Sequence, residues 1–255
     1  MQLEERRERS RYPQVTPEEY LLEERELANN GSRRMPVTVC VDCSYSMRQR
    51  PYQSVESRLD RVMDGLKDFC RDMNADPLAR DSVELCLISF GGEQARVECD
   101  FTTPDRVKLP KLVAEGGTPL ADAVALALEN LEQRKRRYQE NGISYYRPWL
   151  LLIGDGNEKY ANRQLEEMAR KLKEESDEKH LHVLCVIVGD EQDVLREMTS
   201  LKRLSPDGKL QYLRDLKFGE FFGWLSRSIQ KTSQSMSGEE VYYEAVGDWA
   251  EILGG

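Results

Sequence analysis

Oxygen-bearing side chains gather in three short segments of the sequence. These segments are Asp42–Ser46, Gly116–Pro119 and Gly154–Gly156. Together they supply two carboxylates and three hydroxyls, from Asp42, Asp155, Ser44, Ser46 and Thr118. Hard cations prefer oxygen ligands, whereas softer metals prefer cysteine and histidine. If the three segments meet in space, their side chains therefore predict a site for Mg²⁺ or Mn²⁺.

The spacing within the segments suits a shared site. In the D-x-S-x-S pattern that begins at Asp42, alternate residues can turn their side chains to the same side of a tight loop. Gly116 and Gly117 allow close approach of the backbone just before Thr118. Two carboxylates balance the charge of a divalent ion, and neutral hydroxyls leave that ion attractive to one more anionic oxygen. We therefore expect an open position that a partner's Asp or Glu carboxylate fills.

The apolar patterns place these segments at the ends of regular elements. Short apolar and β-branched runs predict strands at 37–41, 83–90, 95–101, 149–153 and 182–188. Apolar residues at steps of three and four predict helices at 54–74, from 118–119 onward, around 165–172 and at 218–229. The alternation predicts an α/β fold: a three-layer, doubly wound, mostly parallel sheet with one antiparallel edge strand. Ligands of such sheets bind beyond the carboxyl ends of the strands.

The order and context of Asp42-x-Ser44-x-Ser46, Thr118 and Asp155 resemble the metal-ion-dependent adhesion site (MIDAS) of von Willebrand factor A (VWA) domains, over about residues 36–232. The resemblance implies that Ser44, Ser46 and Thr118 are direct ligands, and that Asp42 and Asp155 bind directly or through water. Two positions depart from the family pattern. Tyr45 stands where glycine is common, and Gly154 stands where threonine is common.

Within this family the sequence looks most like the bacterial TerY-like proteins of tellurium resistance. The similar segments are Met35–Val37, Gly116–Leu120 and Phe221–Ile229. This resemblance implies a bacterial stress or defence setting in which such domains accompany a protein kinase and a metal-dependent phosphatase. We expect a binding module without catalytic activity.

The domain organisation that we expect has three parts. Residues 1–34 form a helical extension whose helix starts at Thr16-Pro17, residues 35–232 form the VWA domain, and residues 233–255 form an aromatic tail ending in Gly254-Gly255. The Arg134–Arg137 run reads as a solvated helix end. For contacts with a partner around the metal we expect Tyr45, Tyr52, Asn157 and Tyr160.

Charge and composition exclude some classes of function. With 37 basic against 46 acidic residues, the net charge is −9, which disfavours general binding to nucleic acid or anionic lipid. No apolar run approaches the roughly 20 residues that cross a membrane, and no signal-peptide pattern opens the sequence. The six cysteines lie mostly in apolar patterns, as is usual for reduced thiols. We expect a cytoplasmic protein.

Several alternatives stay open at this point. Each of the three segments could simply be a turn or a helix cap. Cys40 and Cys43 could form a redox pair, and His180 and His182 could bind zinc. The Gly154-x-Gly156-x-x-Lys159 sequence lacks the third glycine of a dinucleotide site. Two other functions remain: Mg²⁺-dependent phosphoryl or ester hydrolysis at the same loops, and a structural or substrate role of the C-terminal tail.

Overall fold

The computed structural model describes residues 11–13, 16, 18, 25, 27, 29–50, 54–155, 163–189, 199–234 and 248–253. The strands are β1 (Met35–Asp42), β2 (Val83–Gly91), β3 (Gln94–Thr102), β4 (Trp149–Gly154), β5 (His182–Ile187), β6 (Leu210–Leu213) and β7 (Ala250–Leu253). The helices are η1 (Tyr45–Arg48), α2 (Arg58–Ala75), α3 (Pro77–Ser82), α4 (Leu120–Glu140), α5 (Arg163–Asp177), α7 (Thr199–Leu204), η2 (Arg214–Leu216) and α8 (Phe218–Gln234).

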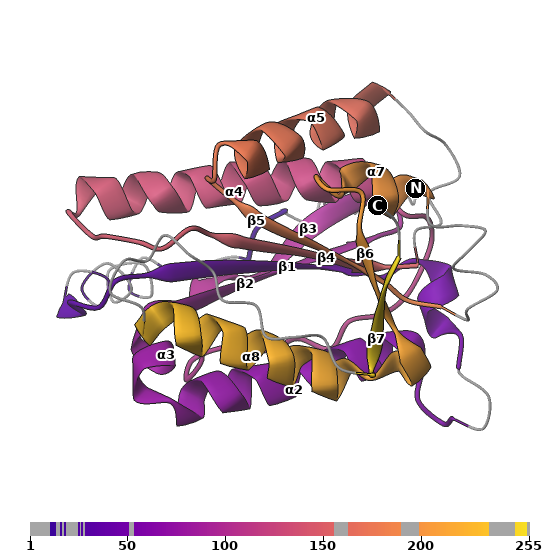
Figure 1. The fold of residues 1–255 in the computed structure, drawn as a ribbon, viewed down its shortest axis with the longest axis horizontal. Coiled ribbons are helices and arrows are strands. Elements are labelled where there is room, and N and C mark those ends of the chain that lie inside the picture. The colour runs from indigo at the N-terminus through magenta and orange to yellow at the C-terminus, as the bar shows by residue number, and fades with distance from the viewer. Residues whose placement is uncertain are drawn as a thin grey trace, which may run out of the picture.

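The strands form one sheet in the order β3-β2-β1-β4-β5-β6-β7. The central five strands run parallel, so their carboxyl ends lie along one edge of the sheet (Figure 1). The strand β3 pairs antiparallel with β2, as the predicted hairpin requires. This confirms the predicted α/β fold with a mostly parallel sheet and an antiparallel edge. A second antiparallel edge, formed by β7 on β6, was not predicted.

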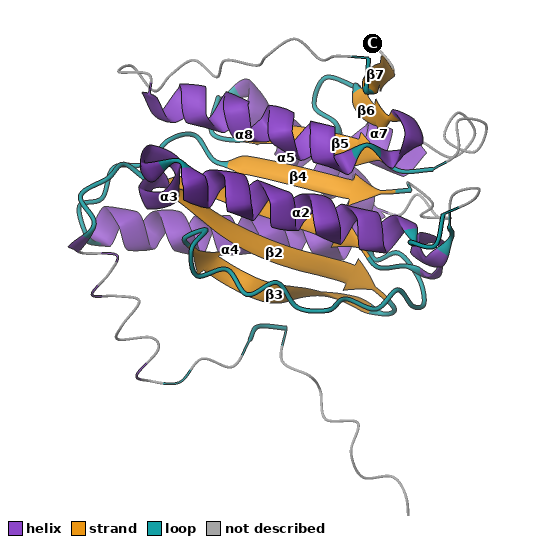
Figure 2. Ribbon diagram, turned by 90° about the horizontal axis from the view of Figure 1, so that it is seen from below, coloured by secondary structure: helices purple, strands orange, loops and turns teal. Residues whose placement is uncertain are grey.

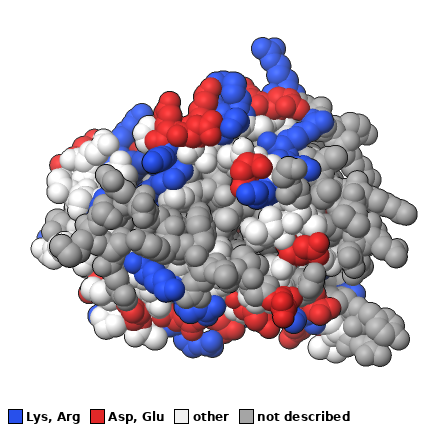
Figure 3. All heavy atoms as spheres, viewed as in Figure 1, with Lys and Arg blue, Asp and Glu red and all other residues white. Residues whose placement is uncertain are grey.

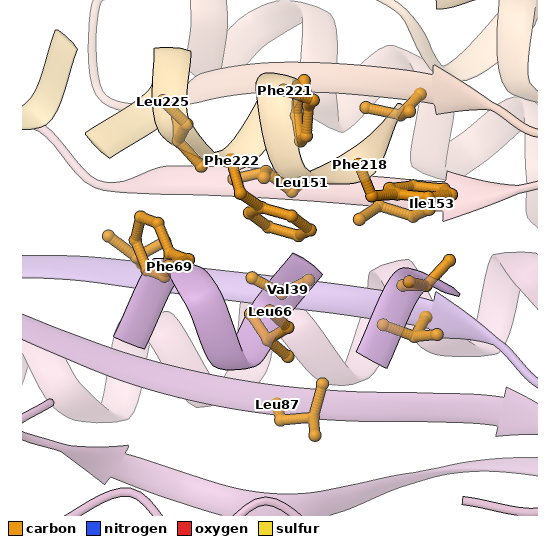
Figure 4. Close-up of a cluster of buried hydrophobic side chains, with 14 of the residues drawn as sticks. Val39, Leu66, Phe69, Leu87, Leu151, Ile153, Phe218, Phe221, Phe222 and Leu225 are labelled. Atoms are coloured by element: carbon orange, nitrogen blue, oxygen red, sulfur yellow. The ribbon is translucent and has the colours of Figure 1, made fainter. Parts of the chain in front are cut away.

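Helices cover both faces of the sheet, as Figures 1 and 2 show. Because side chains alternate along a strand, Val39 and Val41 face α2 and α8, whereas Cys40 faces α4 and α5. Figure 4 shows the first of these two cores, where Phe69 and Leu66 of α2 meet Phe222 of α8 on one face of the sheet. Burial on both faces explains why the central strands are continuous apolar runs.

The helix α2 begins later than we predicted. Ser57 accepts a hydrogen bond from the Asp60 backbone N–H, and the Asp60 carboxylate accepts one from the Ser57 N–H. This reciprocal cap starts α2 at Arg58 instead of residue 54. As a result Val55, which we expected on the buried helix face, lies before the helix and is 84% exposed.

The prediction that Arg134–Arg137 form a solvated helix end is wrong for Arg134. Arg134 is buried, and its guanidinium pairs with Glu84 of β2 at 2.7 Å. The same carboxylate lies 3.6 Å from Arg34, which is also buried. A carboxylate on the neighbouring strand draws Arg134 inward, and the charge pattern of a single helix does not show this.

The two segments that flank the domain are partly described. Trp249 lies against Phe221 and Trp224 of α8, with ring centroids 6.3 and 6.1 Å away, and residues 250–253 then pair with β6. Part of the expected tail thus belongs to the sheet. At the opposite edge, the Arg11 carbonyl accepts a 2.7 Å hydrogen bond from the Val97 N–H of β3. Most of the expected N-terminal helix, and Gly254-Gly255, lie outside the described residues.

None of the helices in the described ranges is long and apolar enough to cross a membrane.

Candidate metal centre

Asp42 is the last residue of the central strand β1 and is fully buried. Its Oδ1 accepts a 2.7 Å hydrogen bond from the Ser44 N–H. Its Oδ2 is buried and has no hydrogen-bond partner among the described residues. The Ser44 and Ser46 hydroxyls lie 3.0 Å apart, so the predicted D-x-S-x-S pattern does bring its two hydroxyls together. One carboxylate oxygen is therefore left without compensation at the end of the sheet.

The electrostatics around Asp42 favour a cation. Burial, together with repulsion from the Asp155 carboxylate, raises the pKa of Asp42 to about 7. Hydrogen bonding from Ser44 and the backbone amide of Asp155 acts in the opposite direction, although no amide meets hydrogen-bond geometry at Oδ2. Two carboxylates close enough to repel each other in a buried place need a positive charge or a proton.

Backbone hydrogen bonds hold the second segment beside the first. The Glu115 N–H donates to the Cys43 carbonyl at 2.7 Å, and the Tyr45 N–H donates to the Gly116 carbonyl at 3.2 Å. Gly92, at the turn between β2 and β3, donates to the Glu115 carbonyl at 2.8 Å. Gly116 has a φ of +67°, and a Cβ there would lie 2.5 Å from the Gly92 Cα. Both glycines are thus needed for three loops to meet, and this role of Gly92 went unnoticed in the sequence.

Thr118 follows these glycines and is half-buried. The sequence allows two competing roles for the Thr118 hydroxyl, which could cap the following helix or bind a metal. The helix α4 begins at Leu120 after Pro119 and has no side-chain cap. The Thr118 hydroxyl makes no hydrogen bond with any residue in the described ranges, so it does not cap α4.

The third segment comes from β4, the other neighbour of β1. Asp155 follows the strand directly and is 5% exposed. At Gly154, a Cβ would lie 2.9 Å from Asp42 Oδ2 and 3.0 Å from Asp42 Cβ. A threonine at this position would collide with the Asp42 carboxylate as it is oriented here. Glycine at position 154, where the family commonly has threonine, therefore leaves space for the Asp42 carboxylate.

The candidate donors, two carboxylates and three hydroxyls, are of the kind that hard cations prefer. Within the described ranges, no three His, Cys, Asp or Glu side chains come together. The unbonded Asp42 Oδ2 gives such an ion a ready ligand. Of the expected partner contacts, Tyr45 is exposed beside this centre. Tyr52, Asn157 and Tyr160 lie outside the described residues.

The other candidate pairs have different environments. Burial raises the pKa of both the Cys40 and Cys43 thiols, and neutral buried thiols are poor redox groups. His182 is buried with its ring centroid 5.2 Å from that of Trp149, whereas His180 is exposed and lies 3.3 Å from Glu178. These environments favour structural roles for all four side chains.

Solved structures with a similar fold include several pilus proteins. PilB minor pilin from Streptococcus sanguinis is 13% identical with a TM-score of 0.59, and the match covers 79% of this chain and 62% of that chain. The vWF domain of the type V pili tip protein Mfa5 from Porphyromonas gingivalis is 11% identical with a TM-score of 0.55, covering 80% and 97%. This chain thus spans less than two thirds of the PilB chain.

No curated protein sequence matches this chain. The family model described as von Willebrand factor type A domain matches residues 37–157, a range that includes Asp42, Thr118 and Asp155. The seven-stranded sheet and its two helical layers have the arrangement expected of that family. Residues 37–157 are therefore similar to a von Willebrand factor type A domain, and all three loops of the candidate metal centre lie within this range.

Proposed function

We propose that this protein is a Mg²⁺-dependent protein-interaction module whose ligand is an Asp or Glu side chain of a partner. One observation carries this proposal: the buried, unbonded Oδ2 of Asp42 beside a second carboxylate and two touching hydroxyls. Such a group is costly to bury unless a cation completes it. Mn²⁺ would bind the same oxygen donors.

Each residue has a separate role in this proposal. Asp42 and Asp155 supply the two negative charges that hold a divalent ion, directly or through water. Ser44, Ser46 and Thr118 supply neutral hydroxyls, which neutralise no further positive charge of the ion. The bound cation would supply a positive charge for the partner's carboxylate. Tyr45, 67% exposed, is placed to contact the partner beside that carboxylate.

The wider setting is also part of the proposal. The TerY-like segments at 35–37, 116–120 and 221–229 support a role in a bacterial stress or tellurium-resistance system, with a protein kinase and a metal-dependent phosphatase as partners. None of the six cysteines, all of which lie in the described ranges, forms a disulfide bond, which supports a reducing cytoplasmic location. Copurification of the tagged chain with such a kinase or phosphatase from its own host would test this setting.

Metal binding is the direct test of the site. Mn²⁺ titration followed by electron paramagnetic resonance should give one site that Mg²⁺ displaces. Asp42→Ala and Thr118→Ala should lose most of the affinity. Thr103→Ala, a half-buried threonine in the loop after β3, serves as the matched control. Unchanged Mn²⁺ affinity in Asp42→Ala and Asp155→Ala would contradict the proposal.

Partner binding is the second test. Affinity capture with Mg²⁺ followed by elution with EDTA should release a partner that Thr118→Ala fails to retain. The proposal also includes the absence of turnover. Hydrolysis of a phosphate monoester or carboxylic ester that Asp42→Ala abolishes would show an enzyme instead. A partner that needs residues 249–255 but not Thr118 would show that the tail, not the metal centre, makes the contact.

A further inference from the structure

Exposed apolar side chains concentrate beside the candidate metal centre. Among the described residues, five large hydrophobic side chains are exposed: Tyr45, Val55, Leu78, Val113 and Ile252. Tyr45 and Val113 lie in the two loops that flank this centre, at 44–50 and 103–118, and Val113 is 60% exposed. Exposed apolar side chains beside a candidate ligand site are available to a binding partner.

The two loops are joined, so Tyr45 and Val113 belong to one surface. The Arg48 Nε–H donates to the Ala114 carbonyl at 2.5 Å, next to Val113. The Arg48 guanidinium also lies over the Tyr45 ring, 5.2 Å from its centroid. At the other end of the first loop, the Arg58 N–H donates to the Gln49 carbonyl at 2.9 Å. Arg48 therefore fixes the position of Tyr45 relative to the second loop.

Three cations share this surface. Arg48, Arg50 and Lys111 form no ion pair within 4.0 Å of any carboxylate in the described part of the chain, although the protein carries a net charge of −9. Arg50 and Lys111 come from different loops, yet both lower the pKa of Asp60 at the start of α2, so they lie on the same side of the molecule.

The cations of α5 are arranged in the opposite way. Arg170, Lys171 and Lys173 each pair with a carboxylate four residues away, and Figure 3 shows acidic and basic side chains intermixed along that edge. Pairing of this kind is the ordinary state of a solvated helix. Arg50 and Lys111, which make no such ion pair within the described ranges, instead have charge to offer to an acidic ligand beside the candidate metal centre.

We propose that Tyr45, Val113, Arg48, Arg50 and Lys111, named here the cationic rim, bind a protein segment in which the metal-binding carboxylate is flanked by further acidic residues and by apolar side chains. This inference rests on the proposed function, because the central carboxylate is the one that the metal receives. The apolar side chains contact Tyr45 and Val113, and the additional acids lie opposite Arg50 and Lys111. Specificity thus comes from the rim rather than from the metal.

A peptide selection tests this assignment. Short displayed peptides with one fixed aspartate and random flanks are selected on the whole protein in Mg²⁺. We expect enrichment of Asp or Glu together with Leu, Phe or other large apolar residues beside the fixed position. In an enriched peptide, the double variant Arg50→Glu/Lys111→Glu should weaken binding about tenfold, and Tyr45→Ser/Val113→Ser by a similar factor.

Matched controls lie far from the loops. Arg136→Glu reverses an exposed charge near the other end of α4, and Leu78→Ser removes an exposed apolar side chain from α3; both should bind the peptide normally. Selection of basic or polar flanks, or insensitivity to the charge reversal, would overturn the inference. Rim-dependent binding to phosphatidylserine vesicles, or a homodimer that the rim variants dissolve, would also overturn it.

Mn²⁺ binding by the same rim variants separates this inference from the proposed function. Intact Mn²⁺ binding without any flank preference would refute the rim and leave the metal-dependent module standing. Peptide selection by the rim that persists in EDTA, in a protein that binds no Mn²⁺, would refute the metal-dependent module and support the rim alone.

Discussion

Two buried carboxylates on neighbouring strands of this sheet have opposite surroundings. Glu84, near the amino end of β2, is enclosed by the Arg134 guanidinium at 2.7 Å, by Arg34 at 3.6 Å and by the Tyr138 hydroxyl, which donates to it. Asp42, at the carboxyl end of β1, has a carboxylate as its charged neighbour and one unbonded oxygen. The first is a completed structural group, whereas the second, in the function that we propose, is completed when a cation binds.

The largest effect that we expect comes from breaking the completed group. Glu84→Gln removes the carboxylate that pairs with the buried Arg134 and lies beside the buried Arg34, so the free energy of unfolding should fall by about 3–5 kcal/mol. Urea denaturation measures this. The control is Glu174→Gln, which removes an exposed pair with Arg170 and should cost less than about 0.5 kcal/mol. A loss below about 1 kcal/mol for Glu84→Gln would mean that the two ends of the sheet do not differ as described.

Mg²⁺ should stabilise the carboxyl end alone. At a free concentration 100 times the dissociation constant, binding to the folded state adds about 2.7 kcal/mol to the free energy of unfolding. Asp42→Asn should abolish this gain, and Asp64→Asn, at an exposed position on α2, should keep it. Thermal denaturation with Mg²⁺ and then with EDTA measures the difference. A gain that survives in Asp42→Asn would place the ion elsewhere.

Low pH should lower the free energy of unfolding through His182, the first residue of β5, at the amino end of the sheet. Burial, followed by the nearby positive charge of Arg147, lowers the pKa of His182 to about 3. The unfolded chain therefore takes up the proton first, and stability is lost as the pH falls from 6.5 toward 3. The expected loss is about 1.4 kcal/mol per pH unit, or about 2 kcal/mol at pH 5. His182→Gln should flatten this dependence in urea denaturation, and His180→Gln should not.

The smallest effect concerns Asp42 without metal. In EDTA at pH 7, Asp42→Asn removes the repulsion with Asp155, so the free energy of unfolding should stay the same or rise by about 1 kcal/mol. Urea denaturation of the metal-free protein measures this. A loss of more than about 2 kcal/mol would show that Asp42, like Glu84, is a structural group.

The sequence was informative where one segment carries its own pattern. The strands at 37–41 and 149–153 and the D-x-S-x-S loop are local features, and the sheet topology then aligns their ends. The pairing of Arg134 with Glu84 depends on residues that are 50 positions apart, and no local pattern encodes it. The same holds for Gly154, whose purpose becomes visible only beside the Asp42 carboxylate.

Short elements were also missed. The strands β6 and β7 have four residues each, too few for an alternating pattern to stand out. The position of β7 is set by Trp249 on α8, a contact between distant parts of the chain. The exposed Val55 was assigned to a helix because its spacing fits, while the Ser57 cap that excludes it was overlooked.

The contact of Arg11 with β3 has a practical consequence. An outer strand of nine residues presents unpaired backbone groups, which invite pairing with another chain and hence aggregation. The Arg11 carbonyl occupies the Val97 N–H, and its side chain reaches Asp122 on α4 at 2.7 Å, so this stretch shields part of that strand. Shortened versions of the protein that begin after Pro13 should therefore precipitate more readily, although every residue of the metal centre would still be present.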